Sequence, residues 1–190
     1  MSLEFNRRSF LKYSAAAAVA VAGSSLLTGC GEDEYQKTGK IGSTLKLMGT
    51  FKMDNPVFSN GVSGTDGVVT GDFVCDMSFK CTSEAALNID PGYFAVTVTH
   101  GSNDPVIYRH ASKQNNHATL TIDDSNPNLT KNKSFETKLH VTNMSVLDDD
   151  KVEVRYFPRL DSSNGQMSVS RSCCTWKMTA KVNGTTVTFE

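Results

Sequence analysis

The run Cys174-Thr175-Trp176-Lys177-Met178-Thr179-Ala180-Lys181-Val182, followed by Asn183-Gly184 and by residues 185–189, decides the predicted fold. Apolar and polar residues alternate along it, so the even-numbered side chains share one face of an extended strand. Asn-Gly between two alternating runs is a strong signal for a β-hairpin, because these residues readily adopt the positive φ angles of a tight turn. The end of the chain is therefore predicted to form two antiparallel strands with one buried face.

The same period of two recurs throughout the chain from residue 41 onward. Alternating or short apolar runs lie at residues 44–53, 69–81, 94–98, 106–108, 118–122, 135–141 and 152–156. Clusters of Asp, Asn, Pro and Gly separate them, as turns require. We expect Asp54-Asn55-Pro56 to end the first run, and residues 84–88 to form at most one helical turn.

Eight to ten short strands with one apolar face each must hide those faces against one another. Two antiparallel sheets packed face to face do this, so residues 41–190 are predicted to form an all-β, antiparallel β-sandwich, immunoglobulin-like in arrangement. A closed barrel is the alternative architecture. A signal peptide is predicted to precede the domain.

The first thirty residues have the features of an export signal. Three basic residues precede residues 15–27, a run of thirteen without charge. As a helix this run would reach about 20 Å, short of the roughly 30 Å hydrocarbon core of a bilayer. The residues that match a known pattern are Arg7, Arg8, Phe10, Leu11 and Lys12.

This order resembles a twin-arginine (Tat) export signal, although Asn6 stands where a Ser or Thr usually precedes the arginines. The resemblance implies recognition by the Tat translocase. An ordinary secretory signal with a basic start, or a buried Ala-rich helix, is the alternative.

A second motif, Leu27-Thr28-Gly29-Cys30, closes the predicted signal. It resembles the lipobox of bacterial lipoproteins, which implies that processing enzymes acylate Cys30, cleave after residue 29 and leave Cys30 as the first residue. Buried CH₂ groups contribute about 0.8 kcal/mol each, so two or three acyl chains would hold a domain at a membrane. A plain signal with an incidental cysteine is the alternative.

These motifs divide the chain into a signal at residues 1–29, a lipidated tether at 30–40 and the β-sandwich at 41–190. The tether is assigned because residues 31–40 are polar and lack periodicity. Residues 30–190 carry 16 basic against 19 acidic residues, a net charge near −3. Such a balance disfavours nucleic-acid binding, and the expected location is the extracytoplasmic face of a membrane.

Four more cysteines, Cys75, Cys81, Cys173 and Cys174, suggest disulfides in an exported protein. The first two lie six residues apart in one predicted strand. That is about 20 Å, beyond the roughly 4.4–6.8 Å between Cα atoms that a disulfide accepts. Cys174 is expected to point inward and to pair with one of them. Cys173 could reach the other only at a bulge or strand end, and free buried thiols are the alternative.

No motif for catalysis or for a cofactor is found in the sequence. The pattern lacks the Cys–His–Met spacing of blue-copper proteins, so no metal is predicted, and His110 and His117 are interpreted as surface residues. The acidic groups at residues 123–124 and 148–150 could hold Ca²⁺ but fit solvated turns better. The exposed-looking aromatic residues are interpreted as core or cross-strand pairs (Tyr93, Tyr108, Tyr156 and Phe157).

Two functions remain open at this point. The first is a non-catalytic, membrane-anchored lipoprotein whose domain binds a protein, a glycan or a small ligand through loops at one end. The alternative is an accessory or electron-transfer component of a Tat-exported redox enzyme, since the Tat pathway moves folded proteins.

Overall fold

The computed structural model describes residues 35–110, 120–161 and 172–190. Residues 33–190 form one compact unit. The Tat-like residues, the lipobox with Cys30, and His117 lie outside the described residues. No helix among the described residues is long and apolar enough to cross a membrane.

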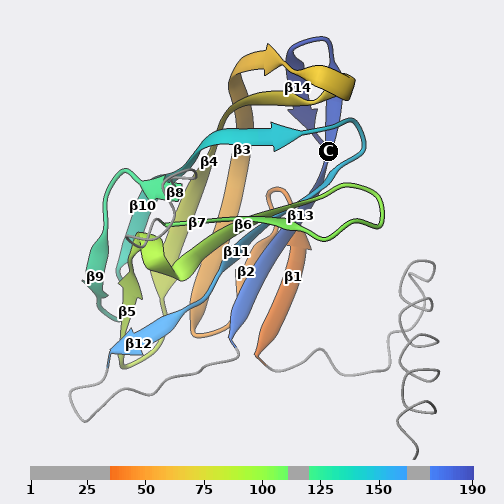
Figure 1. Cartoon of the computed structure of the whole chain (residues 1–190). Helices are drawn as coiled ribbons and strands as arrows, with labels where there is room; N and C mark the ends of the chain where they lie inside the picture. Colours follow the sequence, from red (N-terminus) through yellow and green to blue (C-terminus); the bar gives the residue numbers. More distant parts are fainter. Residues whose placement is uncertain (1–34, 111–119, 162–171) are drawn as a thin grey trace, which may run out of the picture. The chain divides into compact units, whose positions relative to one another are not determined.

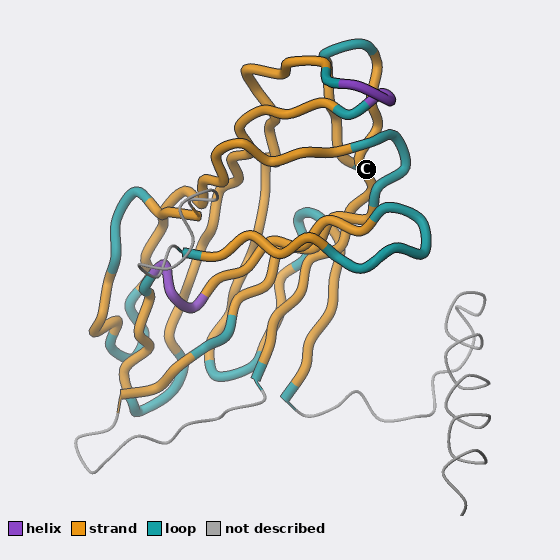
Figure 2. The backbone as a smooth tube through the Cα atoms, viewed as in Figure 1, coloured by secondary structure: helices purple, strands orange, loops and turns teal. Residues whose placement is uncertain are grey.

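The described chain is nearly all strand, which confirms the all-β prediction. The strands are β1 (Gln36–Lys40), β2 (Thr44–Lys46), β3 (Gly49–Ser63), β4 (Val69–Cys81), β5 (Ala86–Ile89), β6 (Phe94–Thr99), β7 (Val106–Arg109), β8 (Leu120–Ile122), β9 (Asn126–Leu129), β10 (Ser134–Val146), β11 (Lys151–Tyr156), β12 (Arg159–Asp161), β13 (Cys173–Asn183) and β14 (Thr186–Phe189). Two short 3₁₀ helices, η1 (Thr65–Gly67) and η2 (Pro91–Tyr93), connect them, as Figure 2 shows in purple.

Three sheets make up the domain (Figure 1). Sheet A has the order β1-β13-β11-β6-β7, with β14 paired to the end of β13; sheet B has the order β2-β3-β4-β10-β8; sheet C is β12-β5-β9. No hydrogen-bonded ladder among the described residues joins sheet A to sheet B. This favours a sandwich-like fold over the closed barrel. The immunoglobulin-like arrangement stays a prediction.

All ladders are antiparallel except the one between β1 and β13, which is parallel from Gln36 opposite Cys173 to Lys40 opposite Lys177. β1 occupies residues that the sequence assigns to the tether. Its alternation is not visible in the sequence because Gln36 to Lys40 contains no large apolar side chain. The first strand of the structure therefore begins about five residues before the boundary predicted for the β-sandwich.

Among the described residues, the core is a single cluster of buried side chains from sheets A and B, to which sheet C adds Leu87, Ile89 and Leu129. Phe51 of β3 and Phe79 of β4 meet Tyr156 of β11, with ring centroids 5.1 and 5.2 Å apart. Trp176 of β13 is fully buried, and its Nε1 donates to the carbonyl of Ser43 at 2.9 Å. Aromatic rings of the two sheets pack against each other because every second residue of a strand points to the same face, and the apolar faces are turned inward.

The predicted C-terminal hairpin is present, with its turn displaced by one residue. Asn183 pairs with Thr186, so Gly184 and Thr185 form the two-residue loop. Gly184 has a φ of 62°. Glycine at the first central position is the arrangement of a type II′ turn, which suits the twist of the flanking strands.

Candidate functional site

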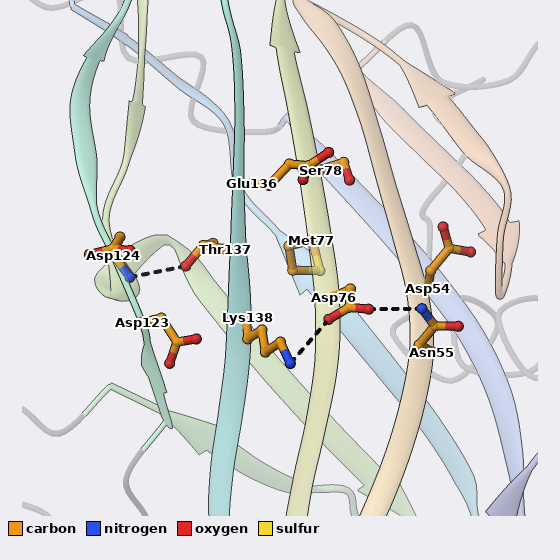
Figure 3. Close-up of a pocket in the computed structure, with 10 residues that line it drawn as sticks. All are labelled: Asp54, Asn55, Asp76, Met77, Ser78, Asp123, Asp124, Glu136, Thr137 and Lys138. Carbon is orange, nitrogen blue, oxygen red and sulfur yellow. Dashed lines mark hydrogen bonds and ion pairs between the residues drawn. The ribbon is translucent and has the colours of Figure 1, made fainter.

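A hollow of about 500 Å³ lies on the outer face of sheet B (Figure 3). Strands β3, β4 and β10 and the segment after β8 form it. It is lined by Asp54, Asn55, Asp76, Met77, Ser78, Asp123, Asp124, Glu136, Thr137 and Lys138. Five of these ten residues are carboxylic acids, against one lysine, so the hollow has a strongly negative character.

The strand register places two of these carboxylates side by side. Asp54 of β3 and Lys138 of β10 both lie opposite Asp76 of β4. Like charges directly across a sheet repel one another. That repulsion is offset by the Asn55 amide, which donates to Asp76 Oδ2 at 2.8 Å, and by Lys138 Nζ at 4.0 Å from Asp76 Oδ1. Lys52 Nζ, 2.6 Å from Asp54 Oδ2, neutralises the other carboxylate.

The segment after β8 is fixed against β10 at the rim of the hollow. Asp123 donates its backbone N–H to the carbonyl of Lys138 at 3.1 Å. The backbone N–H of Asp124 reaches the buried Thr137 hydroxyl at 3.1 Å. His140 Nε2 lies 2.7 Å from Asp123 Oδ1. The rim is therefore held by hydrogen bonds, as Figure 3 shows for Asp124 and Thr137.

This hollow offers acceptor oxygens and charge but little apolar surface. Among the described residues, no group of three or more His, Cys, Asp or Glu is arranged to hold a metal ion. The arrangement suits a polar ligand held by hydrogen bonds at a solvent-open surface. Of the residues that line this hollow, the sequence analysis named only Asp123 and Asp124 as candidate ligand-binding residues. The other lining residues belong to the runs that became β3, β4 and β10, where no motif distinguishes them from ordinary strand residues.

A second polar hollow, of about 440 Å³, lies over β1, β11 and β13 on the outer face of sheet A. Glu153 accepts from Arg155 Nε at 3.0 Å and lies 3.6 Å from Lys177 Nζ. Cys173 lines this hollow, half-buried, with its sulfur 3.4 Å from the Thr175 hydroxyl. Burial raises the pKa of the Cys173 thiol, although Thr175 and Arg155 oppose that shift.

The four cysteines of the domain are free, so the predicted disulfides are absent from the structure. Cys75 points into the core from the middle of β4 and donates to Met77 Sδ at 3.9 Å. Cys81, at the end of β4, faces the carbonyls of Ser83 and Ala85 at 3.5 and 3.6 Å. Cys174 lies opposite Tyr156.

Aromatic side chains fill the space between the two sheets. The Tyr156 ring packs against Phe51, Phe79 and Phe94. The cysteines of β4 have other partners: Cys75 faces the sulfur of Met77, and Cys81 faces two loop carbonyls. Burial raises the pKa of Cys75 well above its usual range and that of Cys174 to about 12. Such thiols stay protonated at neutral pH and are poor nucleophiles.

The acidic run at residues 148–150 is a structural turn between β10 and β11. Asp148 Oδ1 accepts from the backbone N–H of Val182 at 3.0 Å, and a hydrogen bond from Lys181 lowers the pKa of Asp149. Asp150 is buried, and its carboxylate accepts from the backbone N–H of Leu147 at 2.7 Å. Its other oxygen lies 2.7 Å from His100 Nδ1. The interpretation as a turn holds, although Asp150 is not solvated.

The tyrosines and the histidine named in the sequence analysis make structural contacts. Tyr108 and Tyr156 are core residues, as predicted, and each hydroxyl is hydrogen-bonded: Tyr108 accepts from the Ser145 N–H at 3.0 Å, and Tyr156 donates to the Asn88 carbonyl at 3.3 Å. His110 Nδ1 lies 3.1 Å from the Leu120 carbonyl. The ring of Tyr93 carries the Arg159 guanidinium 5.0 Å above its centroid.

Comparison with known proteins identifies the start of the chain. Residues 4–24 match the family model of the TAT (twin-arginine translocation) pathway signal sequence. No curated protein matches the sequence. The chain therefore carries a Tat signal, which directs export across the membrane to the extracytoplasmic space.

Two solved structures are distantly similar to the domain. One is ycdA of Bacillus subtilis, described as a lipoprotein: 14% identity, a TM-score of 0.44, and coverage of 74% of this chain and 39% of that one. The other is MPT63, a secreted protein of Mycobacterium tuberculosis: 13% identity, a TM-score of 0.39, and coverage of 75% of this chain and 98% of that one. Neither likeness assigns a family.

Proposed function

We propose that this chain is an extracytoplasmic lipoprotein, anchored to the membrane through acyl chains on Cys30, whose β-sandwich is a binding domain and not an enzyme. The observation that carries the proposal is the position of Leu27-Thr28-Gly29-Cys30, directly behind the matched signal at residues 4–24. A cysteine after small residues at the end of a signal is the substrate pattern of lipoprotein processing.

The chemistry of the domain supports a binding role. Its hollow on sheet B presents fixed carboxylates and the Asn55 amide at a solvent-open surface. Groups of this kind recognise a polar partner, whether a protein, a glycan or a small ligand, by hydrogen bonds and charge. The ligand site is then on a sheet face, and the loops at one end of the sandwich are not needed for it.

The alternative, an accessory or electron-transfer component of an exported redox enzyme, draws support from the Tat signal, because this pathway carries folded and often cofactor-loaded proteins. It requires a bound metal or a stable complex with a large oxidoreductase subunit. The two functions therefore differ in what purifies with the chain.

The experiment is expression of the full chain in a Tat-competent bacterium, followed by mass spectrometry of the N-terminal peptide from the membrane fraction. We expect an acylated Cys30 as the first residue, and release of a Cys30→Ala variant from the membrane. An unmodified Cys30 in a chain that still begins at Met1 would refute the anchor.

Elemental analysis of the same preparation, with identification of co-purifying subunits, separates the binding domain from the redox alternative. A metal-free, colourless domain without turnover on hydrolase substrates is expected. Stoichiometric metal or an oxidoreductase subunit would favour the alternative.

A further inference from the structure

One end of the sandwich carries four exposed lysines, here called the basic end: Lys46, Lys80, Lys131 and Lys133. The strand register brings them together. Lys46 of β2 lies opposite Thr50 of β3, and Thr50 lies opposite Lys80 of β4. At the last residue of β4, the Cys81 N–H donates to the Lys133 carbonyl at 3.1 Å.

The first strand, β1, also begins at this end. β1 and β2 run in opposite directions from a turn in which the Ser43 N–H donates to the Lys40 carbonyl at 3.0 Å. Gly39 lies against the side chains of Ser43 and Leu45. The start of β1 is therefore level with the end of β2, beside Lys46, and Figure 1 shows β1 and β3 starting from the same lower end of the domain.

The opposite end of the sandwich is acidic. It carries Asp66 in η1, Asp104 after β6, and Asp148 and Asp149 before β11. Lys181 at that end is paired with Asp149. The domain is thus polarised along its strands, although the charge of residues 30–190 is near −3 as a whole.

We propose that the basic end lies on the anionic headgroups of the membrane that holds Cys30, with the acidic end directed away from it. The inference rests on the proposed anchor, and chain length provides its geometry. Cys30 precedes Gln36 by six residues, and six extended residues span at most about 20 Å. A tether of that length keeps the basic end close to the surface.

The attraction is local because salt screens charges beyond about 8 Å. The lysines nearest the surface therefore contribute, and the distant acids do not. Glu84, which pairs with Lys131, and the acids at positions 32, 33 and 34 of the tether reduce the attraction. Each remaining lysine near an anionic surface is expected to raise the partition coefficient about fivefold. Removing the three positive charges should therefore lower the partition coefficient about a hundredfold relative to the wild type, since the tether acids are the same in both.

The test uses the mature chain, residues 30–190, with Cys30→Ser so that no acyl chain contributes. Residues 33–190 form a compact unit with its own core. Co-sedimentation is measured with vesicles of phosphatidylcholine alone and of phosphatidylcholine with phosphatidylglycerol, at low and high ionic strength. The variant K46E/K80E/K133E is compared with K40E/K151E/K177E, which changes the net charge equally at exposed lysines away from the basic end.

We expect binding to the anionic vesicles only, its loss at high salt, and a partition weaker by more than about a hundredfold for K46E/K80E/K133E, in which three positive charges become negative, but not for the control. Equal loss in both variants, or no preference for anionic vesicles, would overturn the proposal. Circular dichroism checks that both fold, and K46Q/K80Q/K133Q replaces the first variant if it does not. Failure here leaves acylation of Cys30 untouched, because that modification is read separately by mass.

Discussion

Replacing Asp150 with alanine tests how much the buried hydrogen bonds of this carboxylate stabilise the turn before β11. The Asp150 side chain is only 3% exposed, and its two oxygens meet the Leu147 N–H and His100 Nδ1, each at 2.7 Å. Hydrogen bonds to a charged group contribute about 1.5–3 kcal/mol each. The cost of burying the carboxylate offsets part of that sum, so we expect D150A to lower the free energy of unfolding by about 3 kcal/mol.

The assay is urea unfolding followed by the fluorescence of Trp176, the single tryptophan, which is fully buried. H100A removes one of the two partners and should lie between wild type and D150A. The matched control is D149N, which changes the neighbouring, exposed carboxylate. Asn accepts the positive φ of 65° found at that position, so its urea midpoint should hardly move. Equal midpoints for D150A and D149N would show that the buried contacts contribute nothing.

Three further predictions follow from the core and its turns. Burial raises the pKa of the Cys174 thiol from 9.0 to about 12, so as the pH rises the unfolded chain loses the thiol proton before the folded chain does. The free energy of unfolding should therefore fall between pH 9 and pH 12, by about 1.4 kcal/mol per pH unit for this group. Urea titrations at alkaline pH should show a smaller fall for C174A than for the wild type. The buried thiols of Cys75, Cys81 and Cys174 should resist alkylation in the folded mature chain, whereas the half-buried Cys173 should react faster. All four should react fully in denaturant without reductant; a mass lower by two or four hydrogens would instead reveal disulfides. Substituting Gly184, whose φ is 62°, with alanine should cost about 1 kcal/mol, whereas a melting temperature equal to wild type would show that the turn relaxes freely.

The strands with strict alternation were predictable because burial on one face acts on every second residue. β4 runs from Val69 to Cys81, the range expected from its alternation. β3 departs from the prediction: it continues through Pro56 to Ser63. Register shifts after Asp54 and after Ser59 show why, since bulges there accommodate Pro56 and the positive φ of Asn55 and Asn60. Proline ends a regular ladder but is tolerated at a bulge.

The sites that escaped prediction depend on pairings between segments far apart in the chain. Asp54 and Asp76 are 22 residues apart, yet they lie opposite each other because β3 and β4 pair in one particular register. The basic end depends in the same way on Lys46 and Lys80 meeting across Thr50. Charges on the wet face of a strand leave no periodic signal, since water accepts any polar residue there. Periodicity therefore identifies the buried half of such a domain, and only the register of its strands shows where the exposed half concentrates charge.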